Sequence, residues 1–307
     1  MKIGVWLSVL LFTLLSLPSV LLYSYESPDV GNLQIFPPDN AWHADISRAP
    51  VHPNSDSYVR SIGLNKSLHP DFGTIWNNAP WGIPYIVVSG NQKKYPVIFT
   101  EYGNESDPGP YPVPLDAPIE GGPASNGDRH VIAIDKDNHI LYELYHAYPK
   151  QDHWEAACGA KFNLDSNQTR PIGWTSADAA GLPIFAGLVR YEEVAIKGEI
   201  NHAIRVTVSR TQRKFVYPAT HFASRSMDPN LPPMGLRLRL KANYDISGFP
   251  RSCQVILKAL KKYGMIVADN GGDWFISGAP DSRWNDSEIN LLKRVKGSDF
   301  EAIISPE

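Results

Sequence analysis

Prolines and glycines are spread along the whole chain, and they limit what it can fold into more than any other feature. The 307 residues include 26 Pro and 23 Gly, about a sixth of the total, so the chain is interrupted too often for a bundle of long helices. Five prolines in 107–118 prevent a strand ladder there and favour an extended crossing of the surface. With 43% hydrophobic residues, the chain can still bury a core, and a loop-rich β protein is expected.

Short segments rich in β-branched and aromatic residues, bounded by turn residues, predict the strands. They lie at 84–89, 95–101, 130–135, 139–146, 155–163, 188–194, 203–209, 214–217 and 236–240. Helical spacing of apolar residues appears only near the C-terminus, in 252–263 and 286–295. We therefore predict a mainly β fold, a single β-sandwich or jelly-roll-like domain with two peripheral C-terminal helices.

The clearest hairpin joins 130–135 to 139–146 through a turn rich in Asp and Asn. If the sequence numbers of two residues paired across the hairpin add up to about 274, His130 lies near Glu143 and Tyr145. Period-two alternation places Glu143 and Tyr145 on one face of this hairpin and Tyr142 and Leu144 on the other. A histidine beside a carboxylate is a minimal acid–base or metal-binding pair, and a solvent-facing polar pair is the alternative.

The N-terminus indicates export. An uncharged apolar run follows Met1 and Lys2 and is about long enough to cross a bilayer. Residues 1–24 are therefore predicted to be a signal peptide or an N-terminal membrane anchor, 25–78 a loop-rich wrap, and 79–307 the β-rich main body that forms one domain with the wrap. We expect a secreted or cell-envelope protein that contacts the membrane only through this segment.

The net charge limits the partners that the chain can bind, and the two cysteines limit its disulfide chemistry. The formal charge of −3 provides no broad basic surface for nucleic acid. Cys158 and Cys253 either form one disulfide after export or remain two buried thiols. The chain has no G-x-S-x-G, phosphate-binding or dinucleotide-binding loop, so nothing in it supports a serine hydrolase, P-loop or Rossmann protein.

Four residues are candidates for catalysis: His130, Glu143, Asp178 and His202. Asp178 lies in a run of very small residues between Trp174 and Pro183, where a ligand or another backbone can approach closely. Its commoner role would be to cap a tight loop. His202 stands at the start of a predicted strand, from which it could transfer a proton.

Four further residues are candidates for binding substrate. Arg205 follows His202 on the same predicted strand and could clamp a uronate, while Trp174 could stack on a sugar ring. Tyr145 shares a face with Glu143, and His221 lies at a short step from strand to loop. His130, His202 and His221 could also bind a divalent metal ion if the fold brings them together, although no H-x-H or H-E-x-x-H spacing supports such a site.

Four segments resemble a largely uncharacterised family of exported bacterial proteins. They are 174–183 (WTSADAAGLP), 198–203 (GEINHA), 232–240 (PPMGLRLRL) and 263–270 (YGMIVADN). The resemblance spans roughly 36–304 and implies one exported domain, with an inclination towards carbohydrate chemistry. It assigns no role to any residue.

These observations predict an exported polysaccharide hydrolase or lyase with a His/carboxylate site on a sheet face. The first alternative is a non-catalytic domain that binds glycan, and the second is a metal-dependent hydrolase. Convergence of His130, Glu143, Asp178 and His202 in one cleft would favour an enzyme, whereas scattered positions beside a flat row of aromatic rings would favour binding.

Overall fold

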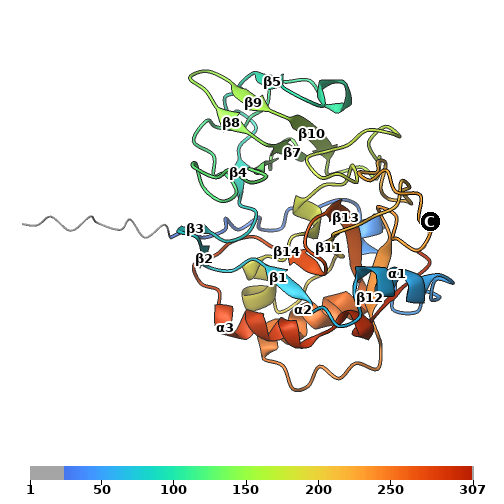
Figure 1. Ribbon diagram of the computed structural model, residues 1–307. Coiled ribbons are helices and arrows are strands. Elements are labelled where there is room, and N and C mark those ends of the chain that lie inside the picture. The colour runs from blue at the N-terminus through green and yellow to red at the C-terminus, as the bar shows by residue number, and fades with distance from the viewer. Residues whose placement is uncertain (1–23, 306–307) are drawn as a thin grey trace, which may run out of the picture.

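The computed structural model describes residues 24–305, so the predicted signal or anchor segment lies outside the described residues except for Ser24. Strands hold 24% of the residues and helices 17%, which confirms the mainly β prediction. The chain forms an upper lobe and a lower lobe, each built around a sheet (Figure 1).

A six-stranded mixed sheet forms the lower lobe. Its strands, in spatial order, are β1 (His69–Asp71), β14 (Phe275–Ser277), β11 (Ile204–Val208), β13 (Met265–Asn270), β12 (Arg237–Leu240) and β15 (Phe300–Ala302). β1 pairs with β14, and β11 with β13, in parallel; the other neighbours are antiparallel. This sheet therefore joins segments that are far apart in the sequence.

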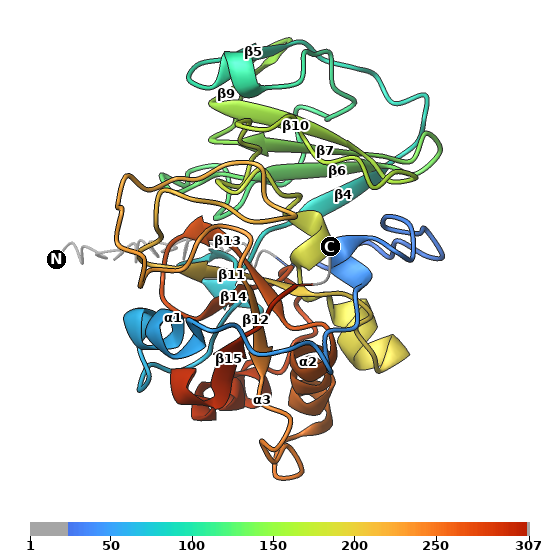
Figure 2. The ribbon, with the colours of Figure 1, turned by 90° about the vertical axis from the view of Figure 1, so that its right-hand side faces the viewer.

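The upper lobe consists of two sheets stacked above the first (Figure 2). The four-stranded sheet has the order β10 (Cys158–Asn163), β7 (Ile140–Tyr145), β6 (Val131–Asp135) and β4 (Tyr85–Val88). The three-stranded sheet above it has the order β5 (Val97–Phe99), β9 (Trp154–Ala156) and β8 (Tyr148–Pro149). A small ribbon, β2 (Ile75–Trp76) and β3 (Ala79–Pro80), lies at the edge between the lobes.

Both faces of the four-stranded sheet are buried, because its side chains alternate between two apolar clusters. Ile132 and Ile134 join the large cluster that fills the lower lobe, whereas Val131 and Ala133 join the smaller cluster under the three-stranded sheet. The two lobes therefore share one continuous core.

The two helices expected near the C-terminus are present. They are α2 (Arg251–Lys262) and α3 (Asp286–Ile289), which continues into the 3-10 helix η5 (Asn290–Arg294). The other helices are short: η1 (Ala41–His43), α1 (Ser55–Ile62), η2 (Gly103–Glu105), η3 (Phe185–Gly187), the π-helix η4 (Glu192–Lys197) and η6 (Gly297–Asp299). Within residues 24–305, every helix is too short or too polar to cross a membrane.

The predicted hairpin is β6–β7, but its register differs by one residue from the expectation. Glu143 pairs with Ile132, so paired numbers sum to 275. Asp135 explains the turn, because its carboxylate accepts hydrogen bonds from the backbone N–H groups of Asp137 and Asn138 at 3.3 and 3.0 Å.

Two predicted strands are not formed. In 188–194 a single bridge at Val189 is followed at once by η4. In 214–217 Phe215 makes one bridge, to Met234. Prolines flank both partners of that bridge, Pro218 on one side and 232–233 on the other, and they remove the N–H groups that would extend the pairing.

The cysteines are two buried free thiols, which was one of the two expected outcomes. Cys158 lies in β10 and Cys253 in α2, so they belong to different lobes. Burial raises the pKa of each thiol to about 11.

Candidate active site

One row of side chains crosses the six-stranded sheet and faces the upper lobe. Phe275 of β14 pairs with His69 of β1 on one side and with Thr207 of β11 on the other. Thr207 in turn pairs with Asp269 of β13, after a bulge at the preceding residue pair. Paired residues on adjacent strands share a face, so two rings, a hydroxyl and a carboxyl group lie in line across four strands.

The β1 end of this row opens into a cleft of about 450 Å³. The rings of His69 and Phe275 stack in its floor with their centroids 3.9 Å apart. Trp81 stands beside them with its indole N–H donated to Asp71 at 3.1 Å, and Trp76 lies 5.8 Å from Trp81 between ring centroids. Trp76 is 62% exposed, so the cleft presents aromatic faces to solvent.

Glu120 brings a carboxylate into this cleft from the upper lobe. It accepts hydrogen bonds from the ring Nδ1 of His130 at 2.6 Å and from the backbone N–H of the same residue at 3.3 Å. Nε2 of His130 points the other way, to the carbonyl oxygen of Ala177 at 3.1 Å. Both ring nitrogens therefore face oxygen acceptors, which an imidazolium satisfies fully.

The pKa values agree with this ion pair. Burial alone would lower the pKa of His130, but the negative charge of Glu120, the hydrogen bond to its carboxylate and the charge of Asp128 together outweigh burial and raise it to about 9. Burial alone would raise the pKa of Glu120, but the positive charge of His130 and the hydrogen bonds from its ring and backbone together outweigh burial, and the pKa is lowered. Glu120 is thus an ionised carboxylate whose side chain is about a quarter exposed.

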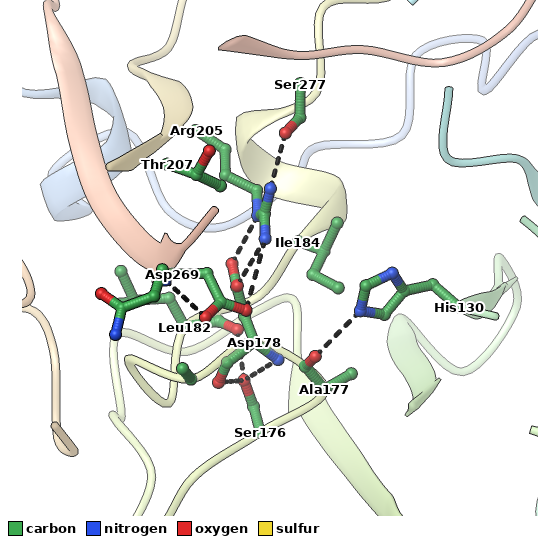
Figure 3. Close-up of polar contacts among 12 residues, drawn as sticks. His130, Ser176, Ala177, Asp178, Leu182, Ile184, Arg205, Thr207, Asp269 and Ser277 are labelled. Atoms are coloured by element: carbon green, nitrogen blue, oxygen red, sulfur yellow. Dashed lines mark hydrogen bonds and ion pairs between the residues drawn. The ribbon is translucent and has the colours of Figure 1, made fainter. Parts of the chain in front are cut away.

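A second charged group lies at the β13 end of this row (Figure 3). It consists of Arg205, Asp178 and Asp269. The guanidinium of Arg205 donates two hydrogen bonds of 2.7 Å to Asp178 and one of 2.6 Å to the hydroxyl of Ser277, and lies 3.7 Å from Asp269. Asp178 is completely buried, whereas the side chain of Asp269 is 26% exposed. Asp269 is therefore the carboxyl group of this cluster that solvent reaches.

The two aspartates share a hydrogen bond, and this changes the chemistry of Asp269. Burial and the adjacent negative charge of Asp178 raise the pKa of Asp269 to about 7, against the opposing effect of Arg205. Asp269 is consequently protonated over much of the pH range in which Glu120 is ionised. Arg205 interacts electrostatically with both Asp269 and Glu120, so one guanidinium influences both carboxyl groups.

Small residues allow the loop that carries Asp178 to pack so tightly. Gly181 has a φ of +74°, and a Cβ there would lie 2.1 Å from the Thr220 hydroxyl oxygen. Ser176 closes the loop by donating to backbone carbonyl oxygens and accepting from the N–H of Asp178 at 2.9 Å. The loop thereby points the Asp178 carboxylate at Arg205.

Glu143 joins the same region but is sealed from solvent. Its two carboxylate oxygens accept the backbone N–H groups of Ile184 and Phe185, at 3.0 and 2.9 Å, at the start of η3. Burial raises its pKa to about 7. Glu143 was predicted to lie near His130, and the charges of both His130 and Asp178 affect its pKa, but its contacts are those of a residue that fixes the backbone.

Tyr145 lies where its prediction placed it, beside His130, with 5.6 Å between ring centroids. Burial raises its pKa to about 12, and the charges of Asp128 and Asp269 add to this effect. The phenol is partly exposed, so it lies near the surface between these acidic groups.

His202 lies elsewhere, which corrects its predicted place among the catalytic residues. It is 4% exposed, its Nδ1 faces the carbonyl oxygen of Ala203 at 2.7 Å, and its Nε2 lies 3.3 Å from Glu193. It lines a different pocket, beside Trp42 and Tyr263.

Trp174 and His221 are also separate from the cleft. Trp174 stacks over the guanidinium of Arg170 at 5.5 Å and lines another hollow. His221 faces the carbonyl oxygen of Ala179 at 2.8 Å and stacks on Phe222. Arg205, predicted as a substrate clamp, is buried with its guanidinium already held by protein groups.

The three-histidine metal centre is not formed in residues 24–305. The one group of metal-binding side chains found there consists of Glu120, Asp128 and His130, with donor atoms within 4.8 Å of one another. Neither His202 nor His221 belongs to it. The ion pair between His130 and Glu120 accounts for two of its three members.

Sequence reasoning missed two acidic residues of this region: Glu120, which lines the cleft, and Asp269, which stands at the other end of the row across the sheet. Each is an acidic residue at the end of an apolar stretch, directly or almost directly before a Gly-Gly pair. The Gly-Gly pair that follows each of them is the signal that could have found them. No family model, curated protein or solved structure matches this chain.

Proposed function

We propose that this protein hydrolyses glycosidic bonds of a neutral polysaccharide, with Asp269 as the proton donor and Glu120 as the carboxylate base or nucleophile. The observation that carries the proposal is that the pKa of Asp269 is raised and that of Glu120 is lowered, while both carboxyl groups interact with the charge of Arg205. Glycoside hydrolysis needs one protonated and one ionised carboxyl group, and environments that separate two pKa values mark such a pair.

In this reaction the bond between the anomeric carbon and the glycosidic oxygen breaks. Asp269 gives its proton to the departing oxygen, and a water molecule supplies the hydroxyl that the anomeric carbon gains. If Glu120 acts as a base, it takes the second proton of that water, and the proton returns to Asp269 through solvent. If Glu120 is the nucleophile, the ionised Asp269 takes that proton when water breaks the covalent intermediate, which restores both groups. Asp178, Arg205 and His130 are positioning residues, because they hold the two carboxyl groups in their different protonation states.

The aromatic cleft supports a sugar polymer as the substrate. Sugar rings present apolar faces that stack on aromatic side chains, and His69, Phe275 and Trp81 surround the cleft. Its charged lining residues are Asp71, Glu120 and Lys293, a net negative set that would repel a uronate.

A lyase is less well supported than a hydrolase. Elimination from a uronate requires a cation that neutralises the substrate carboxylate. Arg205, the expected cation, has its guanidinium bound to Asp178 and Ser277. A neutral substrate needs no such clamp.

The test is incubation of the protein with neutral and uronate polysaccharides, with and without EDTA, following reducing ends and absorbance near 235 nm. We expect reducing ends from a neutral polymer, unchanged by EDTA, and their loss in Asp269→Asn and Glu120→Gln. Asp152→Asn is the matched control, because that aspartate is exposed on the upper lobe. Full activity in both active-site variants, or a rise at 235 nm alone, would contradict the proposal.

Glycan binding without cleavage is the second candidate function, and the exposure of Trp76 favours it specifically. A tryptophan 62% exposed beside a second indole resembles a stacking platform. If the protein only binds glycan, Trp76→Ala will abolish retention on a polysaccharide gel while no reducing ends form with the unmodified chain.

Export remains part of the proposal, because a polysaccharide substrate would be met at the cell envelope or outside. It is supported by the apolar run that follows Lys2. N-terminal sequencing of the protein recovered from cells would distinguish a cleaved signal from a retained anchor.

A further inference from the structure

Three metal-binding side chains meet where the loop 120–130 leads into the four-stranded sheet. They belong to Glu120, Asp128 and His130, and their donor atoms all lie within 4.8 Å of one another. Within residues 24–305, this is the one group of three histidine, cysteine or acidic side chains that comes so close. Imidazole and carboxylate are both common zinc ligands in proteins.

Hydrogen bonds of the backbone hold the three ligands in place. The N–H of Glu120 donates to the carbonyl oxygen of His130 at 3.0 Å, and the carbonyl oxygen of Asp128 accepts from the N–H of His146 at 2.8 Å. Between these ligands, Arg129 donates from its guanidinium to three backbone carbonyl oxygens around it. The loop is therefore ordered before any ion binds, which lowers the free-energy cost of binding.

The ring of His130 is oriented as a metal ligand requires. Its Nε2 lies 3.1 Å from the carbonyl oxygen of Ala177 (Figure 3). The tautomer that carries its hydrogen on Nε2 donates to this oxygen and leaves the lone pair of Nδ1 for coordination. Proteins usually orient metal-binding histidines through such a bond from the other ring nitrogen. Nδ1 itself faces Glu120 at 2.6 Å.

The spacing of the donor atoms fits a small ion. A zinc ion with bonds of about 2.1 Å holds two tetrahedral ligands about 3.4 Å apart. The 2.6 Å between Nδ1 of His130 and Glu120 is shorter than this, and the 4.8 Å within which all three donors lie is longer. The side chain of Glu120 is about a quarter exposed and Asp128 is exposed, so small rotations of both could equalise the distances.

The charge of the group also favours a divalent cation. With a neutral imidazole, the three ligands carry two negative charges, which such an ion neutralises. The nearby guanidinium groups are bound elsewhere, that of Arg129 by carbonyl oxygens and that of Arg205 by Asp178. An ion can enter from solvent, because Glu120 lines the cleft.

We propose that Glu120, Asp128 and His130 bind a zinc ion, with water completing its coordination. Zinc replaces the proton on Nδ1 of His130, which is released to solvent, and forms bonds to that nitrogen and to one oxygen of each carboxylate. Calcium and magnesium should bind more weakly, because they prefer oxygen ligands to imidazole.

Binding of zinc does not depend on hydrolysis in the cleft, but its consequence for activity rests on the proposed function. A bound ion occupies the carboxylate of Glu120, which hydrolysis requires. Added zinc should therefore inhibit hydrolysis, and the metal-free chain should be the active form.

Isothermal titration calorimetry of the EDTA-treated and dialysed chain with zinc chloride tests the site without a substrate. We expect one ion per chain, and at least about tenfold weaker binding of calcium chloride. Asp128→Asn should weaken zinc binding at least about tenfold. Asp165→Asn is the matched control, because that exposed carboxylate also pairs with a histidine, His139 at 2.9 Å, but belongs to no group of three ligands in residues 24–305.

Circular dichroism of the metal-free Asp128→Asn chain checks that it is folded, which the exposure of Asp128 leads us to expect. No saturable binding of zinc, an unchanged zinc affinity in Asp128→Asn, or an equal affinity for calcium would overturn the proposal. Zinc that binds as described without inhibiting hydrolysis would support the site and contradict the role of Glu120 in the reaction.

Discussion

At the scale of single residues, burial decides which carboxyl groups can act. Asp178 and Glu143 are both 0% exposed, and their oxygens are taken by Arg205 and by backbone N–H groups. Asp269 differs because one side of it meets solvent and the other meets Asp178. The negative charge of the buried Asp178 thus raises the pKa of Asp269, whose side chain solvent reaches.

The pH dependence of activity follows from Asp269. With its pKa raised to about 7, its proton is present below pH 7 and lost above it, so kcat should fall on the alkaline side of about pH 7. Asp178→Asn removes the charge that raises this pKa and leaves Arg205 facing Asp269, so the fall should move to lower pH. A pH–rate profile of both proteins measures the shift, with circular dichroism to check folding. An unmoved profile in a folded variant would remove Asp269 from the role of acid.

His130 should make stability depend on pH. Its pKa is raised from 6.5 to about 9 in the folded chain, so its stabilising effect is complete below pH 6.5 and is lost as the pH rises through 9. His130→Gln should lack this loss, which we expect to be on the order of 1–3 kcal/mol. Urea unfolding at pH 7, 8 and 9 measures it. Glu143 and Asp269, whose pKa values are raised to about 7, also change charge at the lower end of this window, but they do so in both proteins, so the difference between the two proteins reports on His130.

At the scale of elements, local pattern predicted strands well where alternation and a turn coincide. The β6–β7 hairpin was found with Glu143 and Tyr145 on the expected face, although the register moved by one. Prediction failed in 188–194, because the ion pair between Arg190 and Glu193 and the left-handed Gly198 favour a π-helix over the strand that β-branched residues suggest. That ion pair joins residues three positions apart, a spacing at which side chains meet on the surface of a helix but not along a strand.

At Gly264, which follows the end of α2, close packing leaves no room for a side chain. It follows α2 with a φ of +67°, and a Cβ there would lie 2.3 Å from the carbonyl oxygen of Leu238 in β12. Gly264→Ala should therefore destabilise the fold by at least about 2 kcal/mol. Gly31→Ala is the matched control, because Gly31 has a φ of +61° but nothing within 4 Å, and it should cost only about 1 kcal/mol. Equal losses in thermal unfolding would refute the steric argument.

At the scale of the whole molecule, the site is assembled from parts that no local pattern connects. Glu120 comes from a loop of the upper lobe, His69 from β1 and Asp269 from β13. His69 reaches the cleft through the parallel pairing of β1 with β14, which joins residues about 200 positions apart. The sequence could therefore suggest the chemistry of a His/carboxylate pair, but not which carboxylate would be chosen.

The free cysteines give a prediction at this scale. Both thiols are buried and their pKa values are raised to about 11, so neither should react with a thiol reagent in the folded protein. Both should react once the chain is unfolded, and reducing agent should leave the melting temperature unchanged. A melting temperature that falls on reduction would show that the thiols are joined.

The strand order of the large sheet also determines when, during synthesis of the chain, the parts of the site can come together. The upper hairpin and its neighbours, 85–163, are complete when barely half the chain has been made, and they can fold as they emerge. β1 is synthesised earlier still, yet its partner β14 ends at Ser277. His69 can therefore stack on Phe275 only after more than two thirds of the chain has been synthesised. The cleft is thus among the last features of the molecule to form.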